Sequence, residues 1–230
     1  CCPTNITSIE QKAIVEAAEK SGGGKVFLEF EPKVAAVGAG MDIFQPRGNM
    51  VIDIGGGTSD IAVLSMGEVV TSRSLRLAGD RMNAEIAAYV KRKHNLLIGE
   101  HTAETIKLKI GSVWHADASE QLEVRGRDIV GGLPVSITIG ADEVELALHE
   151  TMMAIVAAAK EVLEVTPPEL AGDIIDRGIM LTGGGALLRN IANLFSEHLK
   201  VPVVLAEKPL DAVALGTGVL LENIAQKRAH

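Results

Sequence analysis

The sequence has few of the residues on which several common classes of protein depend. Only two of its 230 residues are cysteines, Cys1 and Cys2, and 3% are aromatic. Neighbouring cysteines are poorly placed for a structural disulfide, which argues against a disulfide-stabilised scaffold. The six histidines lack the spacing of a transition-metal site, so we expect no zinc.

Basic residues and long apolar runs are also scarce. The chain has 22 Lys and Arg against 30 Asp and Glu, a net charge of −8. Phosphate backbones require a basic face, so we expect no nucleic-acid partner. No stretch reaches the ~18 apolar residues of a membrane span, and no signal peptide opens the chain. We therefore expect a cytoplasmic protein, and the opening Cys1-Cys2-Pro3, without an initiator methionine, suggests a fragment.

The sequence is rich in apolar residues, which recur in the patterns of helices and strands. Hydrophobic residues make up 47% of the chain, which predicts a globular protein with a substantial core. Thr7 and Glu10 have capping-box spacing ahead of a predicted helix at 8–21. A short strand at 26–30 is expected to end at Glu31, and a small-residue helix is expected from Val34 to Ala39.

The middle of the chain predicts a glycine hairpin followed by helices. Apolar strands on either side of Gly55, Gly56 and Gly57 suggest a hairpin. The further expected elements are a third strand at 69–77, helices at 78–94 and 102–110, two strands within 121–139, and a helix capped by Asp142 that runs to 163. The chain closes with a strand at 178–182, a helix at 186–199, a strand at 203–205 and a helix from about 211. This alternation indicates the α/β class.

Two glycine triplets carry the chemistry. Each follows an apolar strand, so each exposes backbone N–H groups where a phosphate can approach. Asp53 is placed to hold a hydrated divalent cation, and Thr58 adds a hydroxyl beside the phosphates. The second triplet leads into the expected helix at 186–199, whose dipole favours anions. One triplet alone is more often a plain turn, but neither a Walker loop nor a dinucleotide-binding motif competes here.

These residues resemble the superfamily of actin, Hsp70 and sugar-kinase ATPases. Asp53-Ile-Gly-Gly-Gly-Thr58 is similar to its second phosphate motif, and Thr182-Gly-Gly-Gly-Ala186 to its adenosine motif. Further segments resemble the MreB/Mbl family: Pro3-Thr-Asn-Ile-Thr7, Glu31-Pro-Lys-Val-Ala-Ala36, Leu96-Leu-Ile-Gly-Glu100, Thr166-Pro-Pro-Glu-Leu170 and Ala214-Leu-Gly-Thr-Gly218. Cys1-Cys2-Pro3 and Ile43-Phe-Gln-Pro46 are most similar to its Mbl branch.

The resemblance implies an actin-like ATPase fold that lacks most of its N-terminal subdomain. It places 1–45 and 215–230 in the first large subdomain, 46–81 and 146–214 in the second, and 82–145 in a small inserted lobe. The missing third would contain the first phosphate hairpin and a membrane-inserting loop. This chain alone is therefore not expected to be a competent ATPase.

The resemblance also implies site residues. Glu31 would orient the attacking water together with Thr58, and Asp53 would bind Mg through water. Glu104 and Lys107 would contact the ribose and adenine. The remaining expected nucleotide-binding residues are Gly55, Gly56, Gly57, Thr58, Gly183, Gly184, Gly185 and Ala186.

Simpler interpretations stay open for two of these assignments. Glu31 could be a solvated residue at a strand end, and Glu104 and Lys107 could form an intrahelical ion pair. The sequence also departs from the family in one place, because Phe30 stands where a second acidic residue usually precedes the catalytic one. An apolar neighbour there would alter the water network.

As a function, the resemblance implies an ATP-binding cytoskeletal protein. Its copies would form paired protofilaments on the inner face of the cell membrane, with slow, polymerisation-linked ATP hydrolysis. The filaments would direct cell-wall elongation and maintain rod shape together with elongation proteins such as MreC, MreD and RodZ. The alternative is a small-molecule kinase or a chaperone-type ATPase of the same superfamily, which should show a catalytic Asp and a substrate pocket. The sequence offers no candidate for either.

Overall fold

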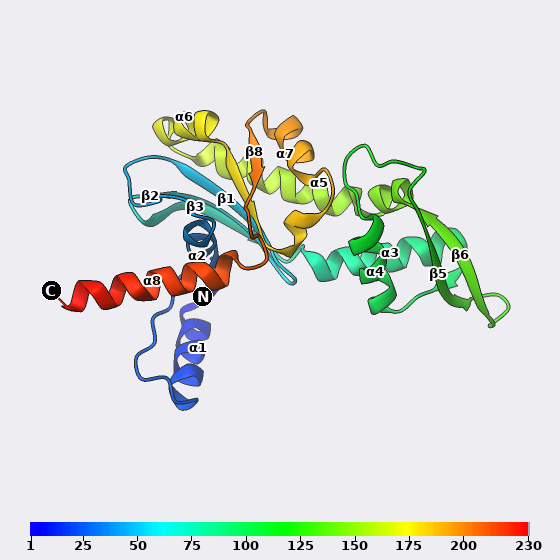
Figure 1. The fold of residues 1–230 in the computed structure, drawn as a ribbon, viewed down its shortest axis with the longest axis horizontal. Coiled ribbons are helices and arrows are strands. Elements are labelled where there is room, and N and C mark those ends of the chain that lie inside the picture. Colours follow the sequence, from blue (N-terminus) through cyan, green and yellow to red (C-terminus); the bar gives the residue numbers. More distant parts are fainter. Residues whose placement is uncertain (230) are drawn as a thin grey trace.

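The computed structural model describes residues 1–229, and its centre is a mixed five-stranded sheet (Figure 1). The strand order is β3-β2-β1-β7-β8. β1, β2 and β3 are antiparallel neighbours, whereas β7 and β8 continue the sheet parallel to β1. The strands span Asn49–Ile54 (β1), Ser59–Ser65 (β2), Glu68–Leu75 (β3), Ile179–Thr182 (β7) and Val203–Leu205 (β8).

A second, three-stranded sheet lies at the far end of the elongated molecule from α8 (Figure 1). It pairs β4 (Leu96–Leu97), β5 (Gln121–Asp128) and β6 (Pro134–Gly140) in antiparallel fashion. α3 (Gly79–His94) and α4 (Glu100–Ile110) pack beside it, and α5 (Ala141–Val165) leads back along the central sheet. The division into subdomains predicted from the sequence stays a prediction.

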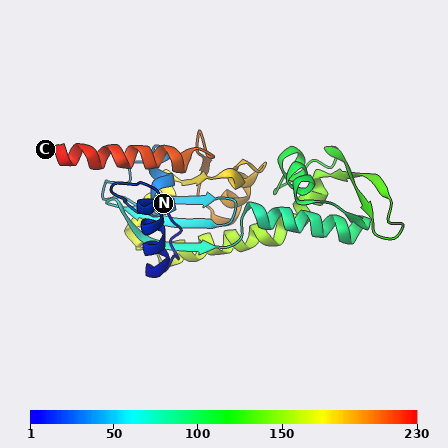
Figure 2. The ribbon, with the colours of Figure 1, turned by 90° about the horizontal axis from the view of Figure 1, so that it is seen from below.

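The central sheet is covered on both faces (Figure 2). α5 packs against β2 and β3, while α2 (Glu31–Gly38) packs against β1 and β2 and is covered by α8 (Ala212–Ala229). In β1, Ile52 and Ile54 belong to the core on the α5 side, and Val51 to the core on the α2 side. Because side chains alternate along a strand, Asp53 faces α2.

α2 and α8 are in backbone contact. A Cβ added at Gly38 would lie 1.7 Å from the Ala212 carbonyl oxygen, and one added at Gly216 would lie 1.9 Å from that of Val34. Only glycine fits at both positions, so the two helices form one tight layer beneath the sheet.

The structure confirms most of the predicted elements. α1 (Ser8–Lys20) begins with the expected capping box: the Glu10 amide donates to Thr7 Oγ1 at 3.3 Å, and the Thr7 amide donates to Glu10 Oε2 at 2.9 Å. The glycine hairpin, the third strand, α3, α4, β5, β6, β7, β8 and α8 also lie where the sequence placed them.

The strand predicted at 26–30 is wrong. Only one bridge forms, between Cys2 and Phe30, with the Cys2 amide donating to the Glu29 carbonyl at 3.0 Å. Pro3 follows Cys2 and has no N–H to extend the ladder. Glu31 consequently opens α2 instead of ending a strand, and α2 starts before the predicted Val34.

Two further helix predictions also need correction. The helix expected at 186–199 is two elements, the 3₁₀ turn η1 (Gly184–Leu187) and α7 (Ile191–Leu199), because Asn190 adopts a left-handed conformation with φ 61°. Asp142 does not cap α5. The cap is Gly140, whose amide donates to Glu143 Oε2 at 3.0 Å.

One helix was not predicted at all. α6 (Pro168–Arg177) begins at the second of two prolines that looked like a break in the chain. Proline is well suited to the first turn of a helix, where its missing N–H has no partner to lose. Within residues 1–229, no helix is long and apolar enough to cross a membrane.

Candidate functional site

The two glycine triplets lie at the same edge of the central sheet. β1 and β7 are parallel neighbours in which Asp53 pairs with Thr182, so their carboxyl ends coincide. The Thr182 hydroxyl donates to Asp53 Oδ1 at 2.9 Å. The turns at 55–57 and 183–185 therefore start side by side, although almost 130 residues separate them in the sequence.

A cavity of about 490 Å³ opens at this edge. One wall is formed by the glycine hairpin, α3 and α4. The other wall is formed by the chain that follows β7. The lining residues are Gly55, Gly56, Gly79, Asp80, Glu104, Lys107, Leu108, Gly111, Gly184, Gly185, Leu187, Leu188, Arg189 and Leu210.

The hairpin end of the cavity is fixed against α3. The amides of Gly79 and Asp80 donate to the carbonyl oxygens of Gly55 and Gly56 at 3.1 and 2.9 Å. A side chain added at Gly57 would meet no atom within 4 Å. This end combines an open glycine turn with the positive end of a 16-residue helix, an arrangement that favours an anion.

Lys107 extends from α4 to the N-terminal end of α3. Its Nζ donates to the Gly79 carbonyl at 3.1 Å. Burial lowers the pKa of Lys107, and the charges of Glu104 and Asp80 oppose this effect. Among the ion pairs of residues 1–229 there is none between Glu104 and Lys107, although the Glu104 charge partly offsets the lowering of the Lys107 pKa by burial.

Three carboxyl groups influence one another beneath the hairpin. Asp53 is 6% exposed, and burial, reinforced by Asp60 and opposed by the Thr182 hydrogen bond, raises its pKa to about 6. Asp60 lies directly opposite Asp53 in the β1–β2 ladder. Burial also raises the pKa of Glu31, with Asp60 and Asp53 contributing. A cation near Asp53 would relieve this unfavourable concentration of negative charge.

Six of the predicted residues line the cavity: Gly55, Gly56, Glu104, Lys107, Gly184 and Gly185. The other predicted residues do not. Asp53 and Ala186 are buried behind the wall, and Gly57 and Thr58 belong to the hairpin turn beyond it. Glu31 lies at the start of α2, which packs on the face of the sheet towards which Asp53 points. No group of three or more His, Cys, Asp or Glu within 1–229 is arranged to hold a metal by itself.

Sequence reasoning missed several residues of the cavity. Gly111 ends α4, and a Cβ there would lie 2.1 Å from the Lys107 carbonyl oxygen and 2.9 Å from Leu188 Cδ2. Its position after a helix and its smallness were the only signals in the sequence. Leu188, Arg189 and Leu210 carried no signal, since their role depends on contacts distant in the sequence.

The arrangement of sheet, glycine turns and cavity matches known actin-like structures. MreB5 of Spiroplasma citri bound to ADP superimposes with a TM-score of 0.96 at 39% identity, over 100% of this chain and 70% of that chain. The same protein bound to AMPPNP gives 0.95 at 39% identity, over 99% and 68%. A MamK double helical filament gives 0.81 at 20% identity and shows the fold alone. The chain is thus an actin-like α/β protein.

A family model described as MreB/Mbl protein matches residues 1–229, and the chain belongs to this family. The cell shape-determining protein Mbl of Bacillus cereus is 66% identical over 97% of this chain and 67% of its own length. Mbl of Bacillus subtilis is 63% identical over the same shares. The cell shape-determining protein MreB of Escherichia coli is 48% identical over 97% of this chain and 65% of its own. The chain thus spans about two thirds of the length of these relatives.

Proposed function

We propose that this chain contributes most of the site at which a membrane-associated filament protein binds ATP with Mg. By family and relatives the chain is a bacterial actin-like cytoskeletal protein with a role in cell shape. The observation that carries the proposal is the meeting of two glycine turns, after neighbouring parallel strands, at one cavity that Lys107 and Glu104 also line.

The cavity suits a nucleotide at both ends. At about 490 Å³ it lies within the usual range for small-ligand sites. The hairpin end provides the open glycine turn for the phosphates. Glu104 and Lys107 would contact the ribose and adenine, and Leu187, Leu188 and Leu210 would provide an apolar surface for the base. The relatives from Spiroplasma citri, which share 39% of their residues with this chain, were solved with AMPPNP and with ADP.

The carboxyl groups suit a divalent cation and a water molecule. Asp53 would hold Mg through water, because its buried carboxylate lacks a positive partner among the residues that the structure describes. The metal would neutralise developing phosphate charge during hydrolysis. Glu31, whose pKa burial raises, would orient the attacking water together with Thr58.

Assembly is the second part of the proposal. Copies of the protein would form paired protofilaments at the inner face of the membrane and guide cell-wall elongation with MreC, MreD and RodZ. Membership of the MreB/Mbl family, whose relatives include cell shape-determining proteins, supports self-association. Identity of 63–66% to Mbl proteins weighs against a small-molecule kinase or a chaperone-type ATPase.

Calorimetric titration of the complete protein with Mg-ATP tests the site. Replacing Lys107 by Met should weaken binding at least about tenfold, because a charge-assisted contact at the cavity is lost. Lys109→Met is the matched control, since Lys109 lies on the same helix with an exposed side chain outside the cavity. Equal affinities of the two variants would contradict the proposed site. Sedimentation with ATP tests assembly separately.

A further inference from the structure

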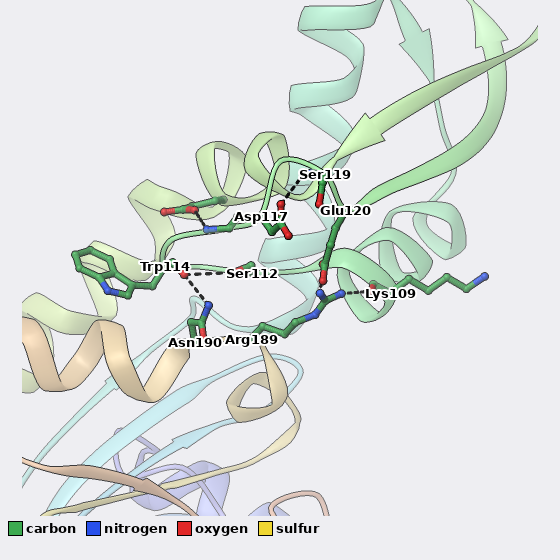
Figure 3. Close-up of polar contacts among 10 residues, drawn as sticks. Lys109, Ser112, Trp114, Asp117, Ser119, Glu120, Arg189 and Asn190 are labelled. Atoms are coloured by element: carbon green, nitrogen blue, oxygen red, sulfur yellow. Dashed lines mark hydrogen bonds and ion pairs between the residues drawn. The ribbon is translucent and has the colours of Figure 1, made fainter.

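A network of polar contacts surrounds Arg189, beside the end of the cavity proposed for the base (Figure 3). Its centre is Arg189, which lies between η1 and α7 and lines the cavity. The guanidinium group donates to the Glu120 carboxylate through Nη1 and to the Lys109 carbonyl oxygen through Nη2. One side chain thereby joins the chain after β7 to the end of α4 and to the residue that precedes β5.

Backbone contacts reinforce this junction. The Arg189 amide donates to the Gly111 carbonyl at 3.2 Å, and the Val113 amide donates to the Arg189 carbonyl at 3.1 Å. The Asn190 side-chain amide donates to the Trp114 carbonyl at 2.8 Å (Figure 3). Residues 111–114 and 189–190 therefore run together like the edge of a small sheet.

Glu120 is itself held in place from the other side. Its carbonyl oxygen accepts from the Ala141 amide at 2.9 Å, at the start of α5. Glu145, further along α5, accepts from the Ala116 amide at 2.7 Å. The loop that carries Glu120 is thus anchored to α5, and Glu120 does not line the cavity.

The junction lies where the two walls of the cavity meet. Gly111 belongs to the α4 wall and Leu188 to the opposite wall, and a Cβ added at Gly111 would lie 2.9 Å from Leu188 Cδ2. Arg189 follows Leu188 directly, and its guanidinium group joins this wall to Lys109 and Glu120 on the other side of the junction.

We propose that the Arg189–Glu120 ion pair is a latch that fixes the separation of the two cavity walls, so that Glu120 is a positioning residue for the nucleoside part of the ligand. The inference rests on the proposed nucleotide site. Glu120 acts through Arg189 and touches no ligand. Loosening the latch lets the walls separate, which speeds nucleotide dissociation.

The expected effect is modest because both side chains are partly exposed, Arg189 at 39% and Glu120 at 42%. For an ion pair of this exposure we expect Glu120→Gln to raise the Kd for Mg-ATP about three- to fivefold. The hydrogen bond from Arg189 to the Lys109 carbonyl survives this substitution, so the wall does not detach.

The test compares two identical substitutions in the complete protein. Glu161→Gln is the control, because Glu161 pairs with Arg73 between α5 and β3 at 3.3 Å and lies outside the cavity. Mg-ATP affinity, its dissociation rate and the melting temperature without nucleotide are measured for both variants. The latch predicts weaker and faster-dissociating ATP for Glu120→Gln only, with melting temperatures that match.

Other outcomes separate the two levels of the proposal. If the wild-type protein binds no Mg-ATP, the proposed function fails and the latch falls with it. If it binds and Glu120→Gln matches the control in affinity and dissociation rate, the latch alone is wrong. A lower melting temperature of Glu120→Gln with unchanged Mg-ATP affinity also overturns the latch, because Glu120 would then have a structural role only. In an Arg189→Met background, Glu120→Gln should have no further effect on affinity, whereas an undiminished effect would show that Glu120 does not act through Arg189.

Discussion

The two glycine turns look alike in the sequence but differ in what surrounds them. In the first, a Cβ added at Gly57 would meet nothing within 4 Å, and one at Gly56 would only approach Asp80 Oδ1 at 3.8 Å. In the second, a Cβ at Gly183 would lie 2.3 Å from the Ile54 carbonyl oxygen, and one at Gly185 would lie 2.2 Å from Ile54 Cγ2. The first turn is open, and the second is packed against the end of β1.

The difference shows that identical motifs can need glycine for different reasons. In the first turn the absence of side chains leaves backbone N–H groups open to a ligand. In the second it lets the chain after β7 lie directly on β1, which keeps the two parallel strands in register. The first turn is therefore the more sensitive to changes in function and the second to changes in stability.

The largest effect is expected for Gly183→Ala. Gly183 has φ +80°, a conformation that alanine adopts with strain, and the added methyl group overlaps the backbone of Ile54. Strain and overpacking together should lower the free energy of unfolding by about 4 kcal/mol. Urea denaturation of the complete protein measures this. A decrease in the free energy of unfolding below about 1 kcal/mol would mean that the second turn does not need glycine for its packing against β1.

Asp53→Asn should have the next largest effect, and it depends on pH. Burial raises the pKa of Asp53 from 3.8 to about 6 in the folded protein. The unfolded chain therefore ionises first, and Asp53 lowers stability progressively between pH 4 and 6 and fully above pH 6. The rise of the pKa from 3.8 to about 6 corresponds to roughly 3 kcal/mol.

Asparagine carries no charge, so the variant should be more stable than wild type above pH 6, and the difference should shrink towards pH 4. Urea denaturation at a series of pH values follows this difference. Mg-ATP binding should weaken in the same variant. A variant that is less stable than wild type at pH 7 would contradict the cause given for the pKa of Asp53.

Glu31→Ala tests the functional role assigned to the first glycine turn. If Glu31 orients water beside the first turn, its loss should slow phosphate release about 10²-fold, roughly 3 kcal/mol of barrier. ATP binding and pelleting should persist, because neither depends on that water. A solvated residue would leave hydrolysis unchanged, and loss of all three activities would indicate misfolding instead of a catalytic role.

The smallest effect on stability is expected for Gly57→Ala, the partner experiment to Gly183→Ala. The methyl group meets no atom, and Gly57 does not have a positive φ. Stability should change by no more than about 0.5 kcal/mol, in the stabilising direction. The same urea denaturation measures it, and a loss comparable to that of Gly183→Ala would erase the distinction between the turns.

Local patterns in the sequence were sufficient for most of the fold. The Thr7–Glu10 capping box, the glycine hairpin after Asp53 and the closing helix after Asp211 depend on nearby residues, and all are found. The predictions failed where the structure depends on contacts distant in the sequence or on an unusual backbone conformation. A strand at 26–30 lacked a partner beyond Cys2, and Asn190 broke a helix whose apolar pattern continued through it.

Part of the site was also predictable, because it depends on local patterns in the sequence. Glycine triplets after strands pointed to Gly55, Gly56, Gly184 and Gly185, which do line one cavity. The ion pair between Glu120 and Arg189 joins residues 69 positions apart, and no periodicity signals such a pair. Likewise, nothing in the sequence around Asp60 indicated that it would lie opposite Asp53 and raise the pKa of that carboxyl.

Amide hydrogen exchange of the complete protein, with and without Mg-ATP, shows whether the nucleotide binds in this cavity, because it locates the ligand residue by residue. Binding there should slow exchange at 55–58, in α4 and at 183–189, the segments around the cavity. The tip between β5 and β6 at 129–133, which lies outside the cavity, should not change in a monomeric sample. Binding of Mg-ATP with protection confined to other segments would contradict binding in this cavity.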